Sequence, residues 1–397
     1  MGLLVALEDG LRASPLNGVT LAAATVDHAL RAESASEALH VSSFCRQLGI
    51  DHAILTWRGQ KPKTGLQAAA RQARYGLLAD HAGQIGADLI VTGHTLDDQQ
   101  ETIAMRRARS PESSTGMAPG VLVDRRVWAL RPLITVRRAD IRAYLGLRGV
   151  GWVDDPSNDN ELFERVRVRK AIAASPQAGS GAASGGREEI ARAVAERLLA
   201  RATICDFRVA TYDLRDWQVG DAIGLRAILH LAAVIGGRSH LAGREAAARI
   251  GRFIESGMPQ RLSSERVVFE RRATRLYLAR ENRGLQPVCA VLGSTIVWDQ
   301  RFRIHNDGRE NLTIANRNGG ESAFPLLSAA IPDDLPARVR QTVLATEPVM
   351  PADCRTTVTV TPILASFDRF LPMDMLEIAN ALAFLGGLDH FPPLPTR

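Results

Sequence analysis

Cysteine is scarce in this chain of 397 residues, and no two cysteines form a Cys-x-x-Cys pair. Zinc ribbons, iron–sulfur sites and disulfide frameworks all need closely spaced cysteines, so the sequence argues against each of them. We expect reduced and mostly buried thiols instead. The cysteines are Cys45, Cys205, Cys289 and Cys354.

Long apolar runs are also missing. No run approaches the roughly 20 residues of a membrane span, and the longest candidate is the Ala-rich stretch 228–235. The first residues carry no basic group ahead of their short apolar run and soon reach Glu8 and Asp9, which is unlike a signal peptide. With 46% hydrophobic and 23% charged residues, the sequence is typical of a soluble globular protein. We therefore expect a cytoplasmic protein with no membrane partner.

Lysine is also scarce. Of the 49 Lys and Arg residues, the lysines are Lys61, Lys63 and Lys170. Arginine suits phosphate oxygens, but a GC-rich genome produces the same bias, so composition alone decides little. The net charge of +6 allows an anionic partner without requiring one. Position is more informative, since residues 101–170 hold 14 basic and 9 acidic side chains.

Residues 1–172 alternate short β-branched runs with amphipathic stretches. This pattern is typical of strand–helix–strand units on a parallel sheet, which predicts an α/β fold. Apolar residues from Leu66 to Leu77 recur at helical spacing. We expect strands at 19–27, 53–57 and 87–92, and helices at 33–48 and around 66–77.

A linker follows this region. Residues 175–186 read SPQAGSGAASGG and contain no apolar side chain larger than alanine. Beyond the linker we expect helices at 188–202, 221–235 and 243–256, a hairpin of 267–269 with 276–279, and strands near 296–298 and 357–360. The predicted organisation is an α/β domain over 1–174, a linker over 175–187, a helical domain over 188–285 and a β-rich region over 286–397.

Acidic residues gather in the segment Val91–Thr102, directly after an expected strand. Thr95 followed by Asp98 predicts a helix start, and this helix places Asp97 and Glu101 on one face. Such carboxylates lie at the edge where α/β sheets bind ligands, and they can hold Mg²⁺ or an ammonium group. Acidic residues that only complement the helix dipole are the simpler alternative. That alternative does not explain the adjoining Gly-His pair.

Several other motifs accompany this segment in a fixed order. They are Thr25-Val-Asp-His-Ala-Leu-Arg31, Gly65-Leu-Gln-Ala-Ala-Ala-Arg-Gln-Ala-Arg-Tyr75, Arg131-Pro-Leu133 and Trp152-Val-Asp-Asp-Pro-Ser-Asn158. As an ordered set with Gly93-His-Thr-Leu-Asp-Asp98, they resemble the PP-loop (N-type) ATP pyrophosphatases, and among these the tRNA(Ile)-lysidine synthetase family. The resemblance runs from about Leu3 to Lys170, and the rest of the chain matches only in general layout.

The resemblance implies an ATP-dependent carbon–nitrogen ligase with ATP and Mg²⁺ as cofactors. In this family ATP adenylates the C2 position of the wobble cytidine, and the amine of free L-lysine then displaces AMP. The implied partners are tRNA(Ile) with a CAU anticodon and free L-lysine, and a homodimer is a further expectation. The resemblance also implies that the domain over 188–285 binds tRNA.

The resemblance assigns three groups of residues. The nucleotide pocket is expected to include Thr25, Val26, His28, Arg74, Gly93 and His94. The catalytic acids are expected to be Asp97, Asp98 and Glu101, which serve Mg²⁺ and lysine, with Asp97 and Asp98 as the metal ligands. The phosphates of tRNA are expected to contact Arg106, Arg107, Arg131, Arg165, Arg167 and Arg169, for which a solvated helix face is the alternative.

One family motif is missing from the sequence. The family begins with a strand and a Ser-Gly-Gly-x-Asp-Ser loop that cradles phosphates, whereas residues 1–14 match the helix after that loop. The missing strand belongs between those expected at 19–27 and 87–92, so both should have unpaired edges. We expect codons upstream of Met1 to encode the strand and the loop. Without them we do not expect adenylation.

Three alternatives stay open. A non-catalytic relative that binds tRNA agrees with the missing loop but not with the intact acidic segment. A tRNA thiolase needs reactive cysteines, and Cys45 stands alone on an expected helix. An amide-forming ligase such as a GMP synthetase agrees less well with the arginine clusters.

Overall fold

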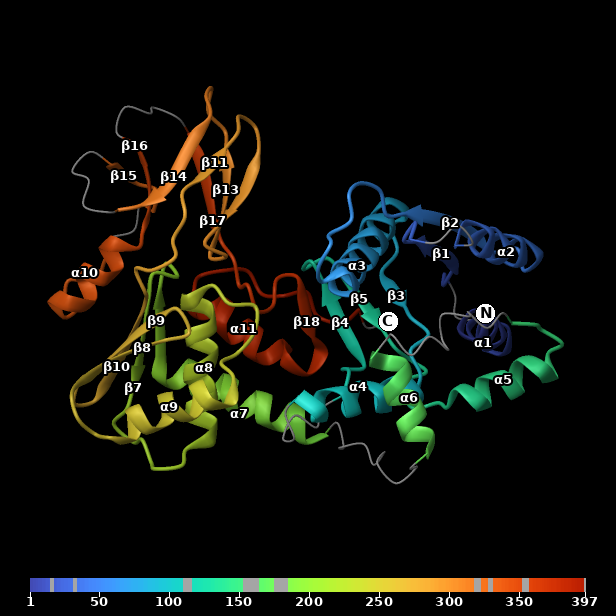
Figure 1. Ribbon diagram of the computed structural model, residues 1–397, viewed down its shortest axis with the longest axis horizontal. Coiled ribbons are helices and arrows are strands. Elements are labelled where there is room, and N and C mark those ends of the chain that lie inside the picture. Colours follow the sequence, from blue (N-terminus) through green and yellow to red (C-terminus); the bar gives the residue numbers. More distant parts are fainter. Residues whose placement is uncertain are drawn as a thin grey trace. The chain divides into compact units, whose positions relative to one another are not determined.

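The computed structural model divides into two compact units, Met1–Ser184 with Pro393–Arg397, and Gly185–Pro392 (Figure 1). Most of the expected linker and residues 153–158 of the Trp152–Asn158 motif lie outside the described residues. The structure describes residues 1–14, 18–30, 34–109, 116–152, 164–174, 185–317, 323–327, 331–351 and 357–395.

The first unit alternates helices and strands, as predicted. Its elements are α1 (Gly2–Ala13), β1 (Ala22–Asp27), α2 (Ser34–Gln47), β2 (Asp51–Thr56), α3 (Leu66–Ile85), β3 (Leu89–Val91), α4 (Leu96–Arg109), β4 (Gly120–Val123), β5 (Val127–Leu130), α5 (Arg138–Leu147) and α6 (Glu164–Ala174). The predicted strands and helices between residues 19 and 92 fall on β1, α2, β2, α3 and β3. The β4–β5 hairpin was not predicted, because its turn uses Asp124 and Arg125 at φ 49° and 56° and carries no glycine.

Two separate sheets form in this unit. Strand β1 pairs in parallel with β2, placing Thr25 opposite Ile54. Strand β3 pairs in parallel with β5, placing Val91 opposite Leu130, and β4 pairs antiparallel with β5. Helix α3 contacts both β1 and β3. No ladder joins β1 to β3 within the described residues, so each has an unpaired edge, as the sequence predicts.

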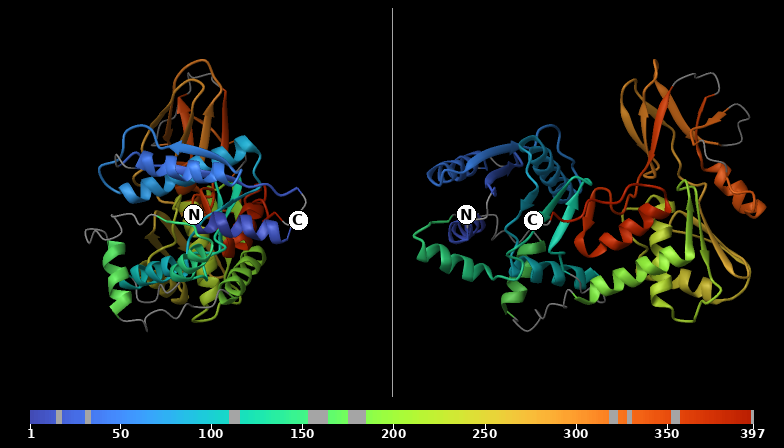
Figure 2. Two further views of the ribbon diagram at one scale, coloured as in Figure 1. Left: turned by 90° about the vertical axis from the view of Figure 1, so that its right-hand side faces the viewer. Right: turned by 180° about the vertical axis from the view of Figure 1, so that it is seen from behind.

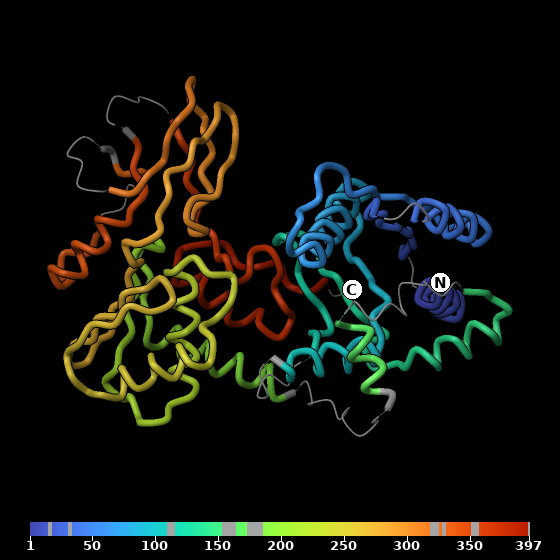
Figure 3. The backbone as a smooth tube through the Cα atoms, in the orientation of Figure 1, coloured from blue at the N-terminus to red at the C-terminus, as the bar shows by residue number. Residues whose placement is uncertain are grey.

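Two pairs of helices also pack against each other in the first unit. Helix α1 packs against α5, with the Cα of Gly2 close to the side chain of Ile141. Helix α6 packs against α4, as the tube in Figure 3 follows. The α4–α6 contact brings Arg165 and Arg169 to Glu101 on the helix that follows β3.

The second unit contains helices and many antiparallel strands. Its elements are α7 (Gly185–Arg201), β6 (Ala202–Cys205), β7 (Val209–Asp213), α8 (Ala222–Gly236), α9 (Arg244–Glu255), β8 (Gln260–Ser264), β9 (Val267–Arg271), β10 (Arg275–Arg280), β11 (Val288–Ala290), β12 (Thr295–Trp298), β13 (Phe302–Asn306), β14 (Leu312–Asn316), β15 (Ala323–Pro325), α10 (Ala337–Ala345), β16 (Pro348–Pro351), β17 (Val358–Pro362), β18 (Phe370–Pro372), η3 (Met373–Met375) and α11 (Leu376–Leu385). Helix α7 lies alongside α11 (Figure 2).

The expectation of a helical domain over 188–285 needs correction. The three expected helices are present, but the same stretch forms a five-stranded sheet in the order β6-β7-β10-β9-β8. The predicted hairpin is confirmed as β9 and β10, with Leu276 opposite Arg271. Strand β8 escaped prediction because Gln260 to Ser264 is a polar edge strand. The expected boundary at residue 285 lies inside this unit and stays a prediction.

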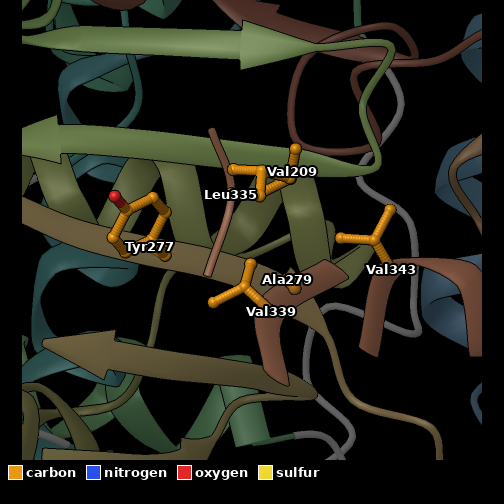
Figure 4. Close-up of a cluster of buried hydrophobic side chains, with 6 residues drawn as sticks. All are labelled: Val209, Tyr277, Ala279, Leu335, Val339 and Val343. Atoms are coloured by element: carbon orange, nitrogen blue, oxygen red, sulfur yellow. The ribbon is translucent and has the colours of Figure 1, made fainter. Parts of the chain in front are cut away.

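Apolar packing on this sheet extends beyond residue 285. Val209 and Tyr277 of neighbouring strands contact Val339 and Val343 of α10, and Val343 is fully buried (Figure 4). Burying such side chains contributes about 1.5–3 kcal/mol each. The sheet of residues 202–280 and helix α10 therefore share a core.

No helix in the described parts of either unit is long and apolar enough to cross a membrane.

Candidate functional site

The acidic segment after β3 starts helix α4 as the sequence predicts. The Thr95 backbone N–H donates to Asp98 Oδ2 at 2.8 Å, and the Asp98 backbone N–H donates to Thr95 Oγ1 at 3.4 Å. This reciprocal pair is a capping box. It fixes the Asp98 carboxylate at the carboxyl end of β3.

Asp98 and Glu101 are surrounded by arginines from α5 and α6. Glu101 is only 2% exposed and accepts hydrogen bonds from Arg165 Nε at 2.6 Å and Arg169 Nε at 2.7 Å. Asp98 Oδ1 accepts from Arg165 Nη2 at 2.9 Å and from Arg138 Nη2 at 3.3 Å. Three guanidinium groups thus neutralise two carboxylates.

These contacts keep Asp98 ionised. Burial opposes its charge, but hydrogen bonds from Thr95 and the charges of Arg165 and Arg138 outweigh that effect and lower the pKa of Asp98. The neighbouring Asp97 has a different partner, since its Oδ2 accepts the backbone N–H of Arg138 at 2.7 Å. Asp97 therefore caps the start of α5, while Glu101 faces α6.

Carboxylate oxygens already engaged by protein donors do not make a metal cage. Within the residues that the structure describes, no three His, Cys, Asp or Glu side chains are grouped to hold a metal ion. Mg²⁺ needs less than that, because it keeps several waters and is often bound through one or two carboxylates and substrate phosphates. Asp97 and Asp98 are adjacent and half-buried, but both oxygens of Asp98 accept hydrogen bonds, so Mg²⁺ would bind there only by displacing Arg138 and Arg165.

Basic side chains lie at the same edge of the sheet. Arg131 directly follows β5, and His94 follows β3, so the parallel pairing of these strands places them near each other. Arg131 is 4% exposed and donates to the Ala118 carbonyl at 2.7 Å and to the Tyr75 hydroxyl at 3.1 Å. Its Nε is buried without a hydrogen-bond partner.

Arg71 of α3 joins this basic group. Its guanidinium carbon lies 5.0 Å from the centre of the Tyr75 ring. Partial burial and the charges of Arg131 and Arg74 lower the pKa of Arg71. Burial first, and then Arg131, also lower the pKa of His94 to about 4. His94 is therefore neutral at pH 7 and shares a hydrogen bond of 3.0 Å with Thr92.

Thr25 and His28, which are expected in the nucleotide pocket, lie near the end of β1. Arg74 Nη2 and His28 Nε2 are 3.1 Å apart, and the His28 ring meets Trp57 edge-on at 6.0 Å. Thr25 Oγ1 lies 2.9 Å from His52 Nε2. Arg74 thus connects the β1 end to the helix that carries Arg71. Of the other expected pocket residues, Val26 lies on β1 and Gly93 in the turn after β3.

The expected tRNA contacts are divided among several places. Arg131 is buried at the strand end, whereas Arg165 and Arg169 are paired with Glu101. Arg106 Nη1 donates to the Gly116 carbonyl at 2.7 Å. Arg107 and Arg167 lie on α4 and α6.

Sequence reasoning missed Arg138 and did not assign a role to Arg71. Arg138 stands in Val-Arg-Arg-Ala-Asp, one arginine among many, and only the folded chain brings it to Asp98. Arg71 was visible at helical spacing beside Tyr75. The signal that distinguishes it is its position near Arg131, which no local pattern reveals.

Comparisons with known proteins identify relatives of this chain. A family model of the PP-loop domain matches residues 1–175. The tRNA(Ile)-lysidine synthase of Rhizobium meliloti is 40% identical over 413 residues, covering 100% of this chain and 91% of the relative. That of Mesorhizobium japonicum is 37% identical, covering 94% of this chain and 87% of the relative. That of Brucella ovis is 40% identical, covering 79% and 73%.

Proposed function

Because the chain belongs to the tRNA(Ile)-lysidine synthase family, we propose that it joins free L-lysine to the wobble cytidine of an isoleucine tRNA with a CAU anticodon. The PP-loop domain over residues 1–175 makes it an ATP-using enzyme. The cytidine C2 oxygen attacks the α-phosphorus of ATP and pyrophosphate leaves. The lysine amine then attacks C2, and AMP departs with the oxygen.

The observation that carries this proposal is the pairing of opposite charges at one sheet edge. Asp98 and Glu101 lie after β3, and Arg131 lies after β5, the strand beside it. Negative charge orients an ammonium group once that group displaces the arginines that now neutralise these carboxylates, and fixed positive charge stabilises the departing pyrophosphate and AMP. A two-step transfer from ATP to an amine needs both.

Residue roles follow from these positions. We assign Asp98 and Glu101 to the lysine amine, and Asp97 with Asp98 to Mg²⁺, which neutralises phosphate charge when bound. Neutral His94 is suited to hydrogen bonding with the nucleotide. The remaining residues that we assign to the nucleotide are Thr25, Val26, His28, Arg74 and Gly93.

The tRNA is assigned to basic side chains of the first unit and to the second unit. The arginines are Arg106, Arg107, Arg131, Arg165, Arg167 and Arg169. Contacts to phosphates fix register and orientation without reading sequence, so this set positions the tRNA and does not select it. A homodimer and a cytoplasmic location stay predictions from the sequence.

The test supplies ATP, Mg²⁺, L-lysine and a tRNA(Ile) transcript, using the protein with a Ser-Gly-Gly-x-Asp-Ser extension ahead of Met1 and the 397-residue chain beside it. We expect lysine-dependent AMP release and lysidine at the wobble position, detected by mass spectrometry, from the extended protein. A transcript with uridine at the wobble position is the control and should give no product. Binding of tRNA by the extended protein without AMP release would contradict the proposal and favour the non-catalytic relative.

A further inference from the structure

The segment Gly116–Pro119 is bonded both to the end of β5 and to helix α4. It leads directly into β4, the strand that pairs with β5. On the β5 side, the backbone N–H of Arg131 donates to the Pro119 carbonyl at 2.8 Å. Arg131 Nη1 also donates to the Ala118 carbonyl at 2.7 Å. The segment therefore holds both the backbone and the guanidinium group of Arg131.

On the α4 side, the amide of Gln99 pairs with the backbone of Met117. Gln99 Nε2 donates to the Met117 carbonyl at 3.0 Å, and the Met117 N–H donates to Gln99 Oε1 at 2.5 Å. Opposed residues of an antiparallel sheet exchange two bonds in the same way. Arg106, also on α4, donates to the Gly116 carbonyl at 2.7 Å. Three consecutive carbonyls thus accept from three different side chains.

The Gln99–Met117 pair requires glycine at position 116. A Cβ atom at Gly116 would lie 2.3 Å from Oε1 and 2.7 Å from Nε2 of Gln99. Non-bonded carbon contacts are much longer, at about 3.5 Å or more. Because the obstructing atoms belong to the end of the Gln99 side chain, a methyl group at position 116 would displace this amide from Met117. A substitution at Gly116 therefore breaks the pair without changing Gln99.

Gln99 stands between the two acidic residues of the site on α4. Asp98 precedes it directly, and Glu101 follows two residues later. The part of α4 that carries these carboxylates is thus tied through residues 116–119 to Arg131. A side-chain amide supplies both the donor and the acceptor that this tie needs.

We propose that Gln99 is a positioning residue, which holds residues 116–119 against α4 and thereby sets the place of Arg131 relative to Asp98 and Glu101. The proposal rests on the proposed function, in which the carboxylates orient the lysine amine and Arg131 stabilises the leaving groups. A displacement of about 1 Å in such a site can lower the rate by about 10²-fold.

The first experiment labels the 397-residue chain with phenylglyoxal, which modifies accessible guanidinium groups, and follows Arg131 by peptide mass spectrometry. Arg131 is 4% exposed, so we expect slow labelling in the wild type. In Gln99→Ala and in Gly116→Ala we expect Arg131 to react about tenfold faster, the scale of one or two lost hydrogen bonds. Gln100→Ala, which removes the neighbouring glutamine of α4, is the matched control and should label as the wild type does.

The double variant Gln99→Ala with Gly116→Ala tests the mechanism. Once residue 99 is alanine, the methyl group at position 116 has no amide to displace. The double variant should therefore label no faster than Gln99→Ala alone. Effects that add, or unchanged labelling of Arg131 in either single variant with a normal circular dichroism spectrum, would overturn the proposal.

The second experiment measures lysine-dependent AMP release by the protein extended with the phosphate loop. We expect Gln99→Ala to lower kcat by about 10-fold to 10²-fold. The KM for L-lysine should not change, because Thr95 and Arg165, not Gln99, hold the two carboxylates. Gln100→Ala should keep the wild-type kcat.

The two experiments separate this proposal from the proposed function. Faster labelling of Arg131 in Gln99→Ala with an unchanged kcat would overturn the positioning role and leave the proposed function intact. Absence of lysidine from the extended wild type would refute the proposed function, and the labelling would still decide whether Gln99 sets the place of Arg131.

Discussion

The buried arginines around Asp299 in the second unit and Arg131 at the end of β5 in the first unit have different partners, although Arg271 of the second unit, like Arg131, donates to neutral acceptors. In the unit over Gly185–Pro392, Arg280 and Arg301 are fully buried around Asp299, which is 2% exposed at its side chain. In the first unit, Arg131 is buried at a strand end with neutral acceptors only. A buried arginine with a carboxylate partner fixes how segments pack. A buried arginine without such a partner, at an edge of the sheet that binds ligands, is available to a substrate. We propose that the Asp299 cluster maintains the fold and that Arg131, because it lies at the edge expected to bind ligands, serves the site.

The carboxylates of Asp98 and Glu101 on α4 are an intermediate case, because they have arginine partners that are partly exposed. Glu101 is buried, but its partners Arg165 and Arg169 are 43% and 31% exposed. The pairs are therefore reached by water and by charged ligands. Such pairs are far easier to exchange than the buried contacts around Asp299.

The largest expected effect is a loss of stability when the Asp299 carboxylate, which pairs with Arg280 and Arg301, is removed. Asp299→Asn leaves two fully buried arginines without a charge partner, and we expect a loss of about 3–5 kcal/mol in the free energy of unfolding. Urea unfolding followed by circular dichroism measures it. Asp80→Asn, which breaks the exposed pair with Arg126, is the control at about 0–1 kcal/mol. Equal losses in the two variants would contradict the distinction.

The second effect concerns the acid pair. In the protein extended with the phosphate loop, we expect Asp98→Asn and Glu101→Gln each to lower lysine-dependent AMP release by about 10²-fold, the scale of one lost electrostatic partner. Steady-state assays with saturating ATP measure this loss. Near-normal turnover in both folded variants would show that the site lies elsewhere.

The third effect is a pH dependence in the second unit. His230 is 3% exposed, neither ring nitrogen has a partner, and burial, followed by the charge of Arg226, lowers its pKa to about 3. The unfolded chain, with a histidine pKa of about 6.5, binds the proton first, so stability present above that pH is lost as the pH falls toward 3. We expect His230→Phe to reduce the loss between pH 6.5 and 5 by about 2 kcal/mol. If wild type and variant lost the same free energy of unfolding between pH 6.5 and 5, the prediction would be refuted.

The fourth effect concerns the cations of α6. Changing Arg165, Arg167 and Arg169 to Ala should weaken tRNA binding and flatten the slope of log K against log salt by about two to three. Filter binding from low to moderate salt measures the slope. A change of about one, equal to that of Arg167→Ala alone, would indicate that Arg165 and Arg169 stay with Glu101 in the complex. An unchanged slope would remove the cluster from the tRNA interface.

The smallest expected effect is on the stability of Arg131→Gln, which we compare with that of Asp299→Asn. Because Arg131 has no charge partner and lies near Arg71, Arg131→Gln should change the free energy of unfolding by less than about 1 kcal/mol. The same urea experiment measures it. A loss as large as that of Asp299→Asn would mean that Arg131 is a structural arginine like Arg280.

Local patterns predicted the scaffold of the site well. The helical spacing from Leu66 to Leu77 predicted α3, and Thr95 with Asp98 predicted the start of α4. The β4–β5 hairpin was missed because Asp124 and Arg125 adopt positive φ without the usual glycine. Propensity reports what a segment favours, and this turn adopts a backbone conformation that its residues seldom favour.

The partners of the acidic residues were beyond sequence reasoning. The spacing of Asp97 and Glu101 predicted one shared face, but Asp97 caps α5 and Glu101 bonds to α6. These contacts join residues 41 and 64 positions apart in the chain. They depend on how α5 and α6 fold back onto α4, which no local periodicity records.

Hydrogen–deuterium exchange tests most directly whether the site lies at the carboxyl ends of β3 and β5. The measurement compares the protein alone with the protein in the presence of ATP, L-lysine and a tRNA(Ile) transcript. We predict slower exchange of backbone amides in residues 92–101 and 131–138, because ligands bound at this edge bury these segments. Protection confined to the unit Gly185–Pro392, with unchanged exchange in both segments, would contradict the account.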